Sequence, residues 1–232
     1  MTDDQQAQWS RTFTMRPEFL GGEPSEPGRA ALARFTAAGA TEVLELGAGQ
    51  GRDTLLFAAA GLRVTALDYA APGLAQIVDK AAAADLPGTV DPVVADVREP
   101  LPLADGTFDG AYAHMLLSMN LTTGEIERLV GEIHRVLRPG GLLAYTVRNT
   151  ADSHYRAGID RGDDRYEVGG FVVHFFDRSL VERLASGFEL LEIADYEEGP
   201  LPRRLFGVTM RNPYGQEPES NEQRATDRQR TA

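Results

Sequence analysis

The chain has 232 residues, of which 42% are hydrophobic and 25% are charged, a composition typical of one folded globular domain with a packed core. Its formal net charge of −12 disfavours nucleic-acid partners, because such a surface repels phosphate backbones. The absence of cysteine excludes disulfides, thiolate metal sites and cysteine nucleophiles. We find no secretory signal and no apolar stretch of membrane-spanning length, so we expect a cytoplasmic protein without a membrane partner.

The N-terminal residues 1–26 are polar, with scattered aromatic side chains and a Gly-Gly-Glu-Pro-Ser stretch. This pattern indicates a loose, flexible arm. Arg16 and Phe19 are candidates to close over a ligand, and an arm without any function is an equally good interpretation. A helix is predicted at residues 27–38, with Pro27 in its first turn.

The main domain is expected to span residues 27–212, followed by a disordered tail at residues 213–232. Within it, short apolar strands are predicted at residues 43–46, 63–67, 92–96, 108–113 and 142–147. They alternate with helices predicted at residues 54–61, 71–84 and 123–137, the last closed by a Pro-Gly-Gly turn. This alternation predicts a parallel sheet that is covered by helices on both faces.

Residues 148–176 interrupt this rhythm with polar, glycine-rich sequence. Because ligand sites of parallel sheets lie beyond the carboxyl ends of the strands, we expect this segment to form a substrate lid. A helix follows at residues 177–186, with Asp177 as its N-cap. Two last strands at residues 188–194 and 205–210 predict a closing antiparallel hairpin.

Three glycines, Gly47, Gly49 and Gly51, lie between the first predicted strand and the next helix. There they allow the backbone to turn tightly and to approach a nucleotide-like cofactor. Asp68 ends the second strand, 21 residues after Gly47, at the offset of an acid that binds ribose hydroxyls; it could also cap the helix that follows. Arg52 stands where the dinucleotide fingerprint requires glycine or alanine, which argues against NAD and for a ligand without a pyrophosphate.

The segment 43–51 resembles the first motif of the class I S-adenosylmethionine-dependent methyltransferases. The resemblance covers residues 40–148 and includes Asp96 and Val97 after the third strand and the segment 137–143. It implies S-adenosylmethionine as the cofactor. It also implies a Rossmann-like, doubly wound α/β fold whose seven-stranded sheet is mostly parallel with an antiparallel last strand. Within the family, the chain is similar to small-molecule enzymes of the tellurite-resistance type.

The glycine loop and the resemblance together define an expected cofactor site. Its residues are Glu45, Gly47, Ala48, Gly49, Gly51, Arg52, Asp68, Tyr69, Asp96, Val97 and Ala113. The resemblance implies that Asp68 binds the ribose, that Asp96 contacts the adenine amine and that Val97 lies beside the ring. It further implies that Ala113 and His114 border the cofactor and its methyl group. The Asn-Pro-Pro-Tyr type of motif of enzymes that methylate nucleobases is missing after the fourth strand, so a nucleic-acid acceptor is not expected.

Methyl transfer from a sulfonium is a direct displacement, so the protein contributes chiefly by holding the reacting groups in line. A general base is needed only for an acceptor that arrives protonated and weakly acidic. We predict His114, His154 and Tyr155 as the catalytic candidates, because they follow the fourth and fifth strands. Asp152 is a further candidate in the same segment. For each histidine a purely structural role is the alternative.

The other histidines carry weaker predictions. His134 is expected to face solvent, and His174 to be either a lid residue or a packed ring. No two histidines share a short motif, so no metal site is expected.

We therefore expect a methyltransferase that acts on the oxygen, nitrogen, sulfur or chalcogen nucleophile of a small molecule. It is expected to be a monomer or a homodimer, with no nucleic-acid partner. One alternative is a catalytically silent regulatory protein that binds S-adenosylmethionine. The other is a nucleotide-dependent oxidoreductase, which Arg52 disfavours.

Overall fold

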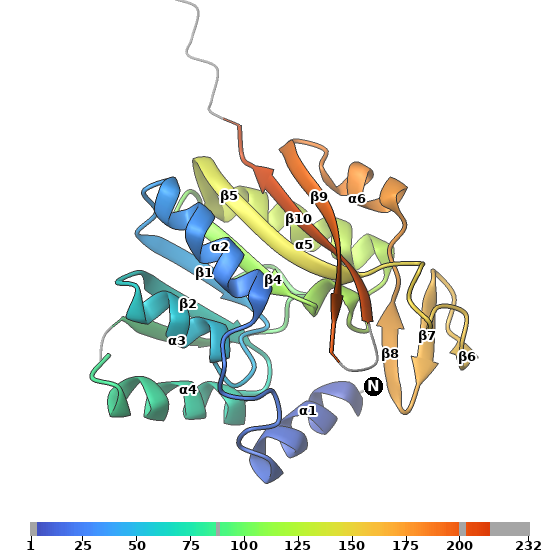
Figure 1. The fold of residues 1–232 in the computed structure, drawn as a ribbon, viewed down its shortest axis with the longest axis horizontal. Helices are drawn as coiled ribbons and strands as arrows, with labels where there is room; N and C mark the ends of the chain where they lie inside the picture. The colour runs from blue at the N-terminus through green and yellow to red at the C-terminus, as the bar shows by residue number, and fades with distance from the viewer. Residues whose placement is uncertain (1–3, 87–88, 200–202, 214–232) are drawn as a thin grey trace, which may run out of the picture.

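The computed structural model describes residues 4–86, 89–199 and 203–213. Its centre is a seven-stranded sheet with the strand order β3-β2-β1-β4-β5-β10-β9 (Figure 1). The strands are β1 (Glu42–Leu46), β2 (Arg63–Asp68), β3 (Val90–Val94), β4 (Phe108–His114), β5 (Leu137–Arg148), β9 (Glu189–Glu198) and β10 (Arg203–Arg211). Six of them run in one direction and β10 runs against them. This confirms the predicted Rossmann-like sheet with its reversed last strand.

Helices cover both faces of the sheet, as predicted (Figure 1). The helices of the described residues are α1 (Asp4–Met15), which lies beyond the edge of the sheet, α2 (Glu26–Ala37), α3 (Arg52–Ala59), α4 (Ala71–Ala83), the 3-10 turn η1 (Leu116–Ser118), α5 (Thr123–Val136) and α6 (Arg178–Leu184). Because side chains alternate across a strand, Leu44 and Leu46 join the core with α5 and α6, whereas Val43 joins the core with α2 and α3. Among the described residues, no helix combines the length and the apolar character that a membrane crossing requires.

Strands β5 and β9 extend furthest beyond their predicted ends. The segment from Leu137 to Gly141, expected to be the last helical residue and a Pro-Gly-Gly turn, is the first part of β5, because Leu137 already pairs with Phe108 of β4. β9 continues to Glu198, since the hairpin pairs Glu198 with Arg203 at the start of β10. As β9 points in the same direction as β1, β2, β4 and β5, the last residues of these strands lie along one edge of the sheet.

The segment expected to be a loose arm contains a helix that the sequence did not predict. Helix α1 packs against α4, and Phe13 is almost completely buried there, with 3% of its surface exposed. Gln76 of α4 donates a hydrogen bond to the carbonyl of Phe13 at 2.8 Å. Tertiary contacts therefore order a segment whose own sequence pattern is too weak to indicate a helix. The expected tail lies outside the described residues from residue 214 onward.

The predicted lid segment 148–176 also contains unpredicted structure. It forms a separate three-stranded antiparallel sheet of β6 (Ile159–Asp160), β7 (Arg165–Val168) and β8 (Phe171–His174). The ring of Phe171 lies 5.4 Å from the ring of Trp9 in α1. The small sheet and α1 thus meet, although Trp9 and Phe171 lie 162 residues apart in the chain (171 − 9).

Close contact between α4 and the glycine loop leads to a stability prediction. A Cβ on Gly73 would lie 2.2 Å from the carbonyl oxygen of Gly49, so we expect Gly73→Ala to lower the free energy of unfolding by about 3 kcal/mol. Gly131, inside α5, is the matched control, because a Cβ there would meet nothing within 4 Å. Gly131→Ala should raise the free energy by about 0.5–1 kcal/mol. Urea unfolding measures both changes, and equal effects would contradict the packing described.

Candidate functional site

The glycine loop and Asp68 are joined by backbone hydrogen bonds at the edge of the sheet. One carboxylate oxygen of Asp68 accepts the Gly49 N–H at 2.8 Å and the other accepts the Ala70 N–H at 2.8 Å. Burial raises the pKa of Asp68, and these two bonds oppose that rise. Each oxygen retains a lone pair, and Asp68 lines a cavity. The carboxylate can therefore brace the loop and accept ligand hydroxyls together.

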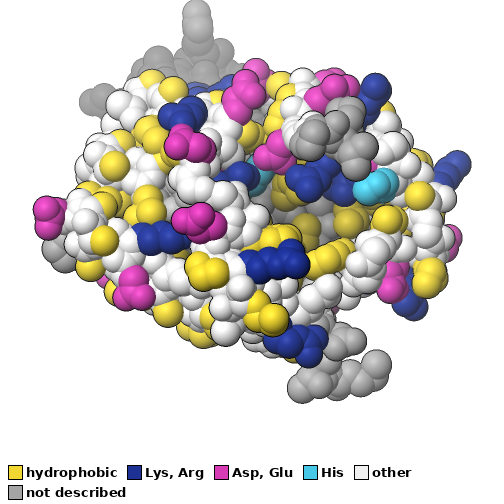
Figure 2. Space-filling view, turned by 60° about the horizontal axis from the view of Figure 1, so that its bottom comes forward, with side chains coloured by type: hydrophobic (Ala, Val, Ile, Leu, Met, Phe, Trp, Pro, Cys, Tyr) yellow, Lys and Arg dark blue, Asp and Glu magenta, His cyan; other side chains and the backbone are white. Residues whose placement is uncertain are grey.

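This cavity has a volume of about 340 Å³. Figure 2 shows hydrophobic and basic side chains gathered around the hollow on this face of the molecule. Most of the residues predicted from the sequence line it, namely Glu45, Gly47, Ala48, Gly49, Arg52, Asp68, Tyr69, Asp96, Val97 and His114. Four predicted residues are not part of the lining, namely Gly51, Ala113, His154 and Tyr155.

Asp96 lies in the cavity wall with its carboxylate held by Arg98. The Arg98 side chain donates hydrogen bonds to both oxygens through Nε at 2.9 and 3.0 Å, and its backbone N–H binds one of them at 2.9 Å. Partial burial disfavours the charged carboxylate, but these bonds outweigh it and lower the pKa of Asp96. Asp96 is therefore a fixed anionic acceptor at this wall.

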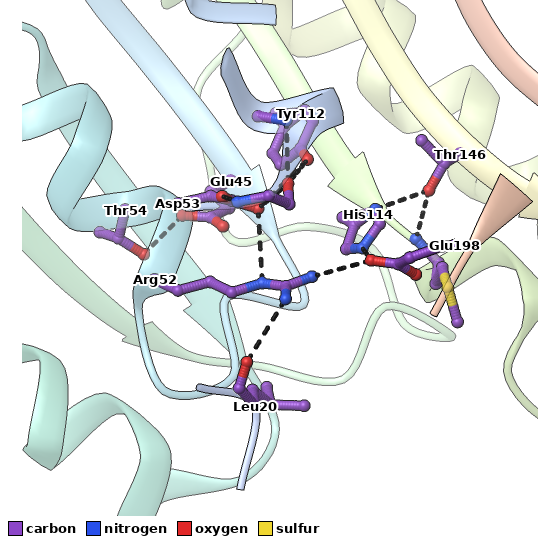
Figure 3. Close-up of polar contacts among 12 residues, drawn as sticks. Leu20, Glu45, Arg52, Asp53, Thr54, Tyr112, His114, Thr146 and Glu198 are labelled. Carbon is purple, nitrogen blue, oxygen red and sulfur yellow. Dashed lines mark hydrogen bonds and ion pairs between the residues drawn. The ribbon is translucent and has the colours of Figure 1, made fainter. Parts of the chain in front are cut away.

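Two further acidic residues, Glu45 in β1 and Asp53 in α3, flank the glycine loop. Asp53, at the start of α3, accepts hydrogen bonds from the Ser25 backbone and hydroxyl, both at 2.7 Å, and from the Tyr112 hydroxyl at 3.2 Å. Glu45 accepts a hydrogen bond from the Thr54 hydroxyl (Figure 3). Burial, reinforced by the charge of Asp53, raises the pKa of Glu45 well above its ordinary value. This part of the cavity is thus rich in carboxyl groups.

His114 and Glu198 face each other in the cavity wall. His114 Nδ1 lies 2.8 Å from the hydroxyl of Thr146, its partner in the β4–β5 register. Its Nε2 lies 3.3 Å from a carboxylate oxygen of Glu198. Figure 3 shows the Arg52 side chain extended between Asp53 and Glu198, with 3.5 Å between its guanidinium and the Glu198 carboxylate. The site thus joins residues from β4, β5, β9 and α3.

Glu198 is the main site residue that the sequence analysis missed. The predicted strand ended at residue 194, so its last residue was misplaced by four positions. The position of β9 could have indicated Glu198. Because β9 runs parallel to β4, its carboxyl end must reach the same edge of the sheet as the carboxyl end of β4. The N-terminal arm also contributes lining residues that the sequence analysis does not predict, namely Gln5, Trp9, Phe13 and Leu20. The sequence analysis names only Arg16 and Phe19 of the arm as ligand-covering candidates.

Hydrogen bonds of the Gln50 side chain hold the N-terminal arm against the glycine loop. Gln50 accepts the Leu20 N–H at 3.1 Å and donates to the carbonyl of Arg16 at 2.8 Å. Phe19 lines the cavity, as considered from the sequence, and its ring lies 6.0 Å from that of Trp9. Arg16 is not part of the lining, and its guanidinium lies over the Phe19 ring, 5.9 Å from the ring centroid. Hydrogen bonds and aromatic contacts thus hold the cover of the cavity in place.

His154 and Tyr155 occupy a structural network away from the cavity lining. The backbone N–H of His154 donates to Asp152 at 2.8 Å, and the Tyr155 hydroxyl donates to Asp164 at 2.9 Å. Asp152 is 4% exposed and forms an ion pair with Arg148, whose Nε lies 3.0 Å away. The Asp152 carboxylate thus links His154 to Arg148 at the end of β5.

Loss of the Asp152 carboxylate should destabilise the protein. Asp152→Ala leaves the buried guanidinium of Arg148 without its partner, so we expect the free energy of unfolding to fall by about 3–5 kcal/mol. Asp177→Ala, which removes only the exposed cap of α6, should cost about 1 kcal/mol. Urea unfolding compares the two variants. A cost for Asp152→Ala no larger than that of the cap would contradict this assignment.

The two remaining histidines lie outside the cavity lining. His174 is buried, with 1% of its surface exposed, and its Nδ1 lies 2.7 Å from the carbonyl oxygen of Leu121. Burial lowers the pKa of His174, so this ring is a packed one rather than a lid residue. His134 packs edge-on against Phe188 and is partly covered by it, rather than simply facing solvent.

Ionised Glu198 should contribute stability in a pH-dependent manner. The hydrogen bond from His114 is the main reason that the pKa of Glu198 falls to about 2, below the ordinary value of 4.5. A carboxyl group whose pKa is lower in the folded state than in the unfolded state stabilises the fold when the pH lies above the unfolded pKa. This stabilisation is lost as the pH falls toward the folded pKa of about 2. We expect the free energy of unfolding of wild type to be about 1–2 kcal/mol higher than that of Glu198→Gln near pH 6. Near pH 2 the two free energies should be equal. Urea unfolding at both pH values tests this, and a constant difference would contradict it.

Comparison of the sequence with known proteins finds methyltransferases. A family model described as a methyltransferase domain matches residues 43–141. A phosphatidylethanolamine N-methyltransferase of Cereibacter sphaeroides is 31% identical over 150 residues, which are 65% of this chain and 71% of that protein. A malonyl-[acyl-carrier protein] O-methyltransferase of Pseudescherichia vulneris is 35% identical over 116 residues, which are 50% of this chain and 42% of that protein. The match thus spans less than half the length of this last relative.

Solved structures show the same fold. The 1,6-didemethyltoxoflavin-N1-methyltransferase of Burkholderia thailandensis superposes with a TM-score of 0.71 at 22% identity, over 90% of this chain and 87% of that one. N-methyltransferase NodS of Bradyrhizobium japonicum gives a TM-score of 0.69 at 17% identity, over 91% of this chain and 100% of that one. At these identities the likeness is one of architecture.

Proposed function

The chain belongs to the class I S-adenosylmethionine-dependent methyltransferases, and we propose that it transfers the methyl group of this cofactor to a small-molecule acceptor bound beside His114. One observation carries the proposal. A single cavity of about 340 Å³ reaches from Asp68 to His114 and Glu198 and is covered by residues of α1. Pockets of this size suit small ligands.

The residues of the cavity fit the cofactor. Asp68 would hold ribose hydroxyls with the lone pairs that the Gly49 and Ala70 amides leave available. The carboxylate of Asp53 lines the same part of the cavity and would offset positive charge on the ligand. When bound, S-adenosylmethionine supplies an activated methyl group on a sulfonium.

His114 is the residue we propose to take a proton from the acceptor. A threonine hydroxyl both donates and accepts, so Thr146 can hold Nδ1 in either tautomer. With the proton on Nδ1, Nε2 offers a lone pair toward the cavity, where an acceptor O–H or N–H would replace Glu198. The charges of Arg52 and Arg203 also lower the pKa of Glu198, and its carboxylate would stabilise the imidazolium that forms. The 3.3 Å separation is the loose contact expected before a substrate tightens the site.

The test uses cofactor labelled in its methyl group and a cell extract separated into small molecules and macromolecules. We expect label to enter the small-molecule fraction together with formation of S-adenosylhomocysteine. Label found only in macromolecules would overturn the small-molecule acceptor. Tight cofactor binding without any S-adenosylhomocysteine in either fraction would favour the catalytically silent alternative.

A further inference from the structure

The two parts of the cavity carry opposite charge. Asp53 and Asp68 are at the cofactor end, where their hydrogen-bond partners are neutral hydroxyl or amide groups. At the acceptor end, Glu198 is the acid of the lining and two arginines of the lining, Arg52 and Arg203, approach it. Arg52 is shared with Asp53, whose carboxylate lies 4.0 Å from its guanidinium, whereas Arg203 approaches Glu198. Arg203 therefore supplies a positive charge at this end, where the carboxylate of Glu198 already faces Arg52, in a chain whose formal net charge is −12.

The contacts of these two arginines are long. The Arg203 guanidinium lies 3.7 Å from the Glu198 carboxylate, which is an ion pair beyond hydrogen-bond distance. Arg52 donates to Glu198 at 3.5 Å and to the Leu20 carbonyl at 3.3 Å. Arginine presents five N–H donors in a planar fork that matches an anionic oxygen group. In the described part of the chain, these contacts leave donor capacity on both side chains.

We propose that the acceptor carries an anionic oxygen group, a carboxylate or a phosphate, which Arg203 binds with help from Arg52. This rests on the proposed function and names the class of its substrate. The register places the group, because Arg203 pairs with Glu198 in the β9–β10 hairpin, directly beside the carboxylate that faces His114. Binding at Arg203 therefore holds the rest of the acceptor at the Nε2 of His114.

The remainder of this acceptor is apolar. Trp9, Phe19 and Met119 line the same cavity and offer aromatic and thioether surfaces. The ligand that fits is a small acid with a hydrophobic, preferably aromatic, body. A cationic amine would instead meet two guanidinium groups.

The chain contains one tryptophan, Trp9, and it lines the cavity, so its fluorescence reports binding there. The protein with bound S-adenosylhomocysteine is titrated with four probes that share a phenyl ring: benzoate, phenyl phosphate, neutral benzamide and cationic benzylamine. We expect at least one anion to bind about tenfold more tightly than benzamide, the effect of one charge-assisted hydrogen bond. The tighter of the two anions identifies a carboxylate or a phosphate as the group.

Arg203→Gln should abolish the preference for the anion. The matched control is Arg204→Gln on the same strand, because Arg204 pairs with Glu197 and does not line the cavity; it should keep the preference. Benzamide or benzylamine binding as tightly as both anions, no saturable change with either anion, or equal losses in the two variants would each overturn the proposal.

The labelling experiment separates this inference from the proposed function. Methylation of a neutral or cationic small molecule would overturn the anionic acceptor and leave the small-molecule function standing. Anion binding at Arg203 without transfer to any small molecule would overturn the proposed function, and with it the assignment of this site to an acceptor.

Discussion

Asp68→Asn is expected to weaken the binding of S-adenosylhomocysteine by about 100-fold. The variant removes the charge that strengthens two hydrogen bonds from the ribose, each worth about 1.5–3 kcal/mol to a charged group, and about 1.4 kcal/mol corresponds to a factor of ten. It also replaces one of the oxygens that hold Gly49 and Ala70 by an amide that cannot accept. Calorimetric titration measures the loss.

The control for this variant is Asp91→Asn. Asp91 lies on the neighbouring strand β3 and pairs with Arg63 at the surface, so its loss should leave binding unchanged. Thermal unfolding shows whether Asp68→Asn remains folded. Binding of the folded variant within about threefold of wild type would mean that Asp68 does not hold the ribose.

His114→Gln is expected to lower kcat by about 100-fold or more, while the affinity for S-adenosylhomocysteine changes little. General-base catalysis contributes roughly 10²–10⁴ in rate, and glutamine cannot take the proton. Glu198→Gln should also lower kcat, because it removes the carboxylate that lies 3.3 Å from Nε2. Steady-state kinetics with an acceptor found in the labelling experiment, together with calorimetry, separates the two effects.

His154→Gln is the matched control, since His154 follows β5 and does not line the cavity. Its kcat should equal that of wild type. An equal loss in the His154 variant, or full activity of a folded His114 variant, would contradict the role given to His114. Full activity of the His114 variant would also mean that the acceptor binds already deprotonated, as a thiolate or an oxyanion would.

Much of the fold could be predicted because the necessary signals are local. The alternation of short apolar strands with helices indicates a covered parallel sheet, and the glycines before α3 together with Asp68 after β2 mark its ligand edge. The resemblance to a known family supplied the number of strands, the antiparallel last strand and the cofactor. The narrower likeness to the tellurite-resistance type stays a prediction.

The unpredicted parts depend on contacts between distant segments. Helix α1 is ordered by α4 and by the aromatic contact between Trp9 and Phe171, and no pattern within residues 4–15 shows these partners. His154 appeared equivalent to His114 in the sequence, since both follow a parallel strand. The structure distinguishes them, because only His114 has Glu198 beside it in the cavity.

The most direct test of this account is a crystal structure of the protein with S-adenosylhomocysteine. The account predicts the ribose hydroxyls on the Asp68 carboxylate and the sulfur directed toward the part of the cavity that holds His114 and Glu198. A ligand bound elsewhere, or one whose sulfur points away from His114, would contradict the claim that one cavity brings cofactor and acceptor together.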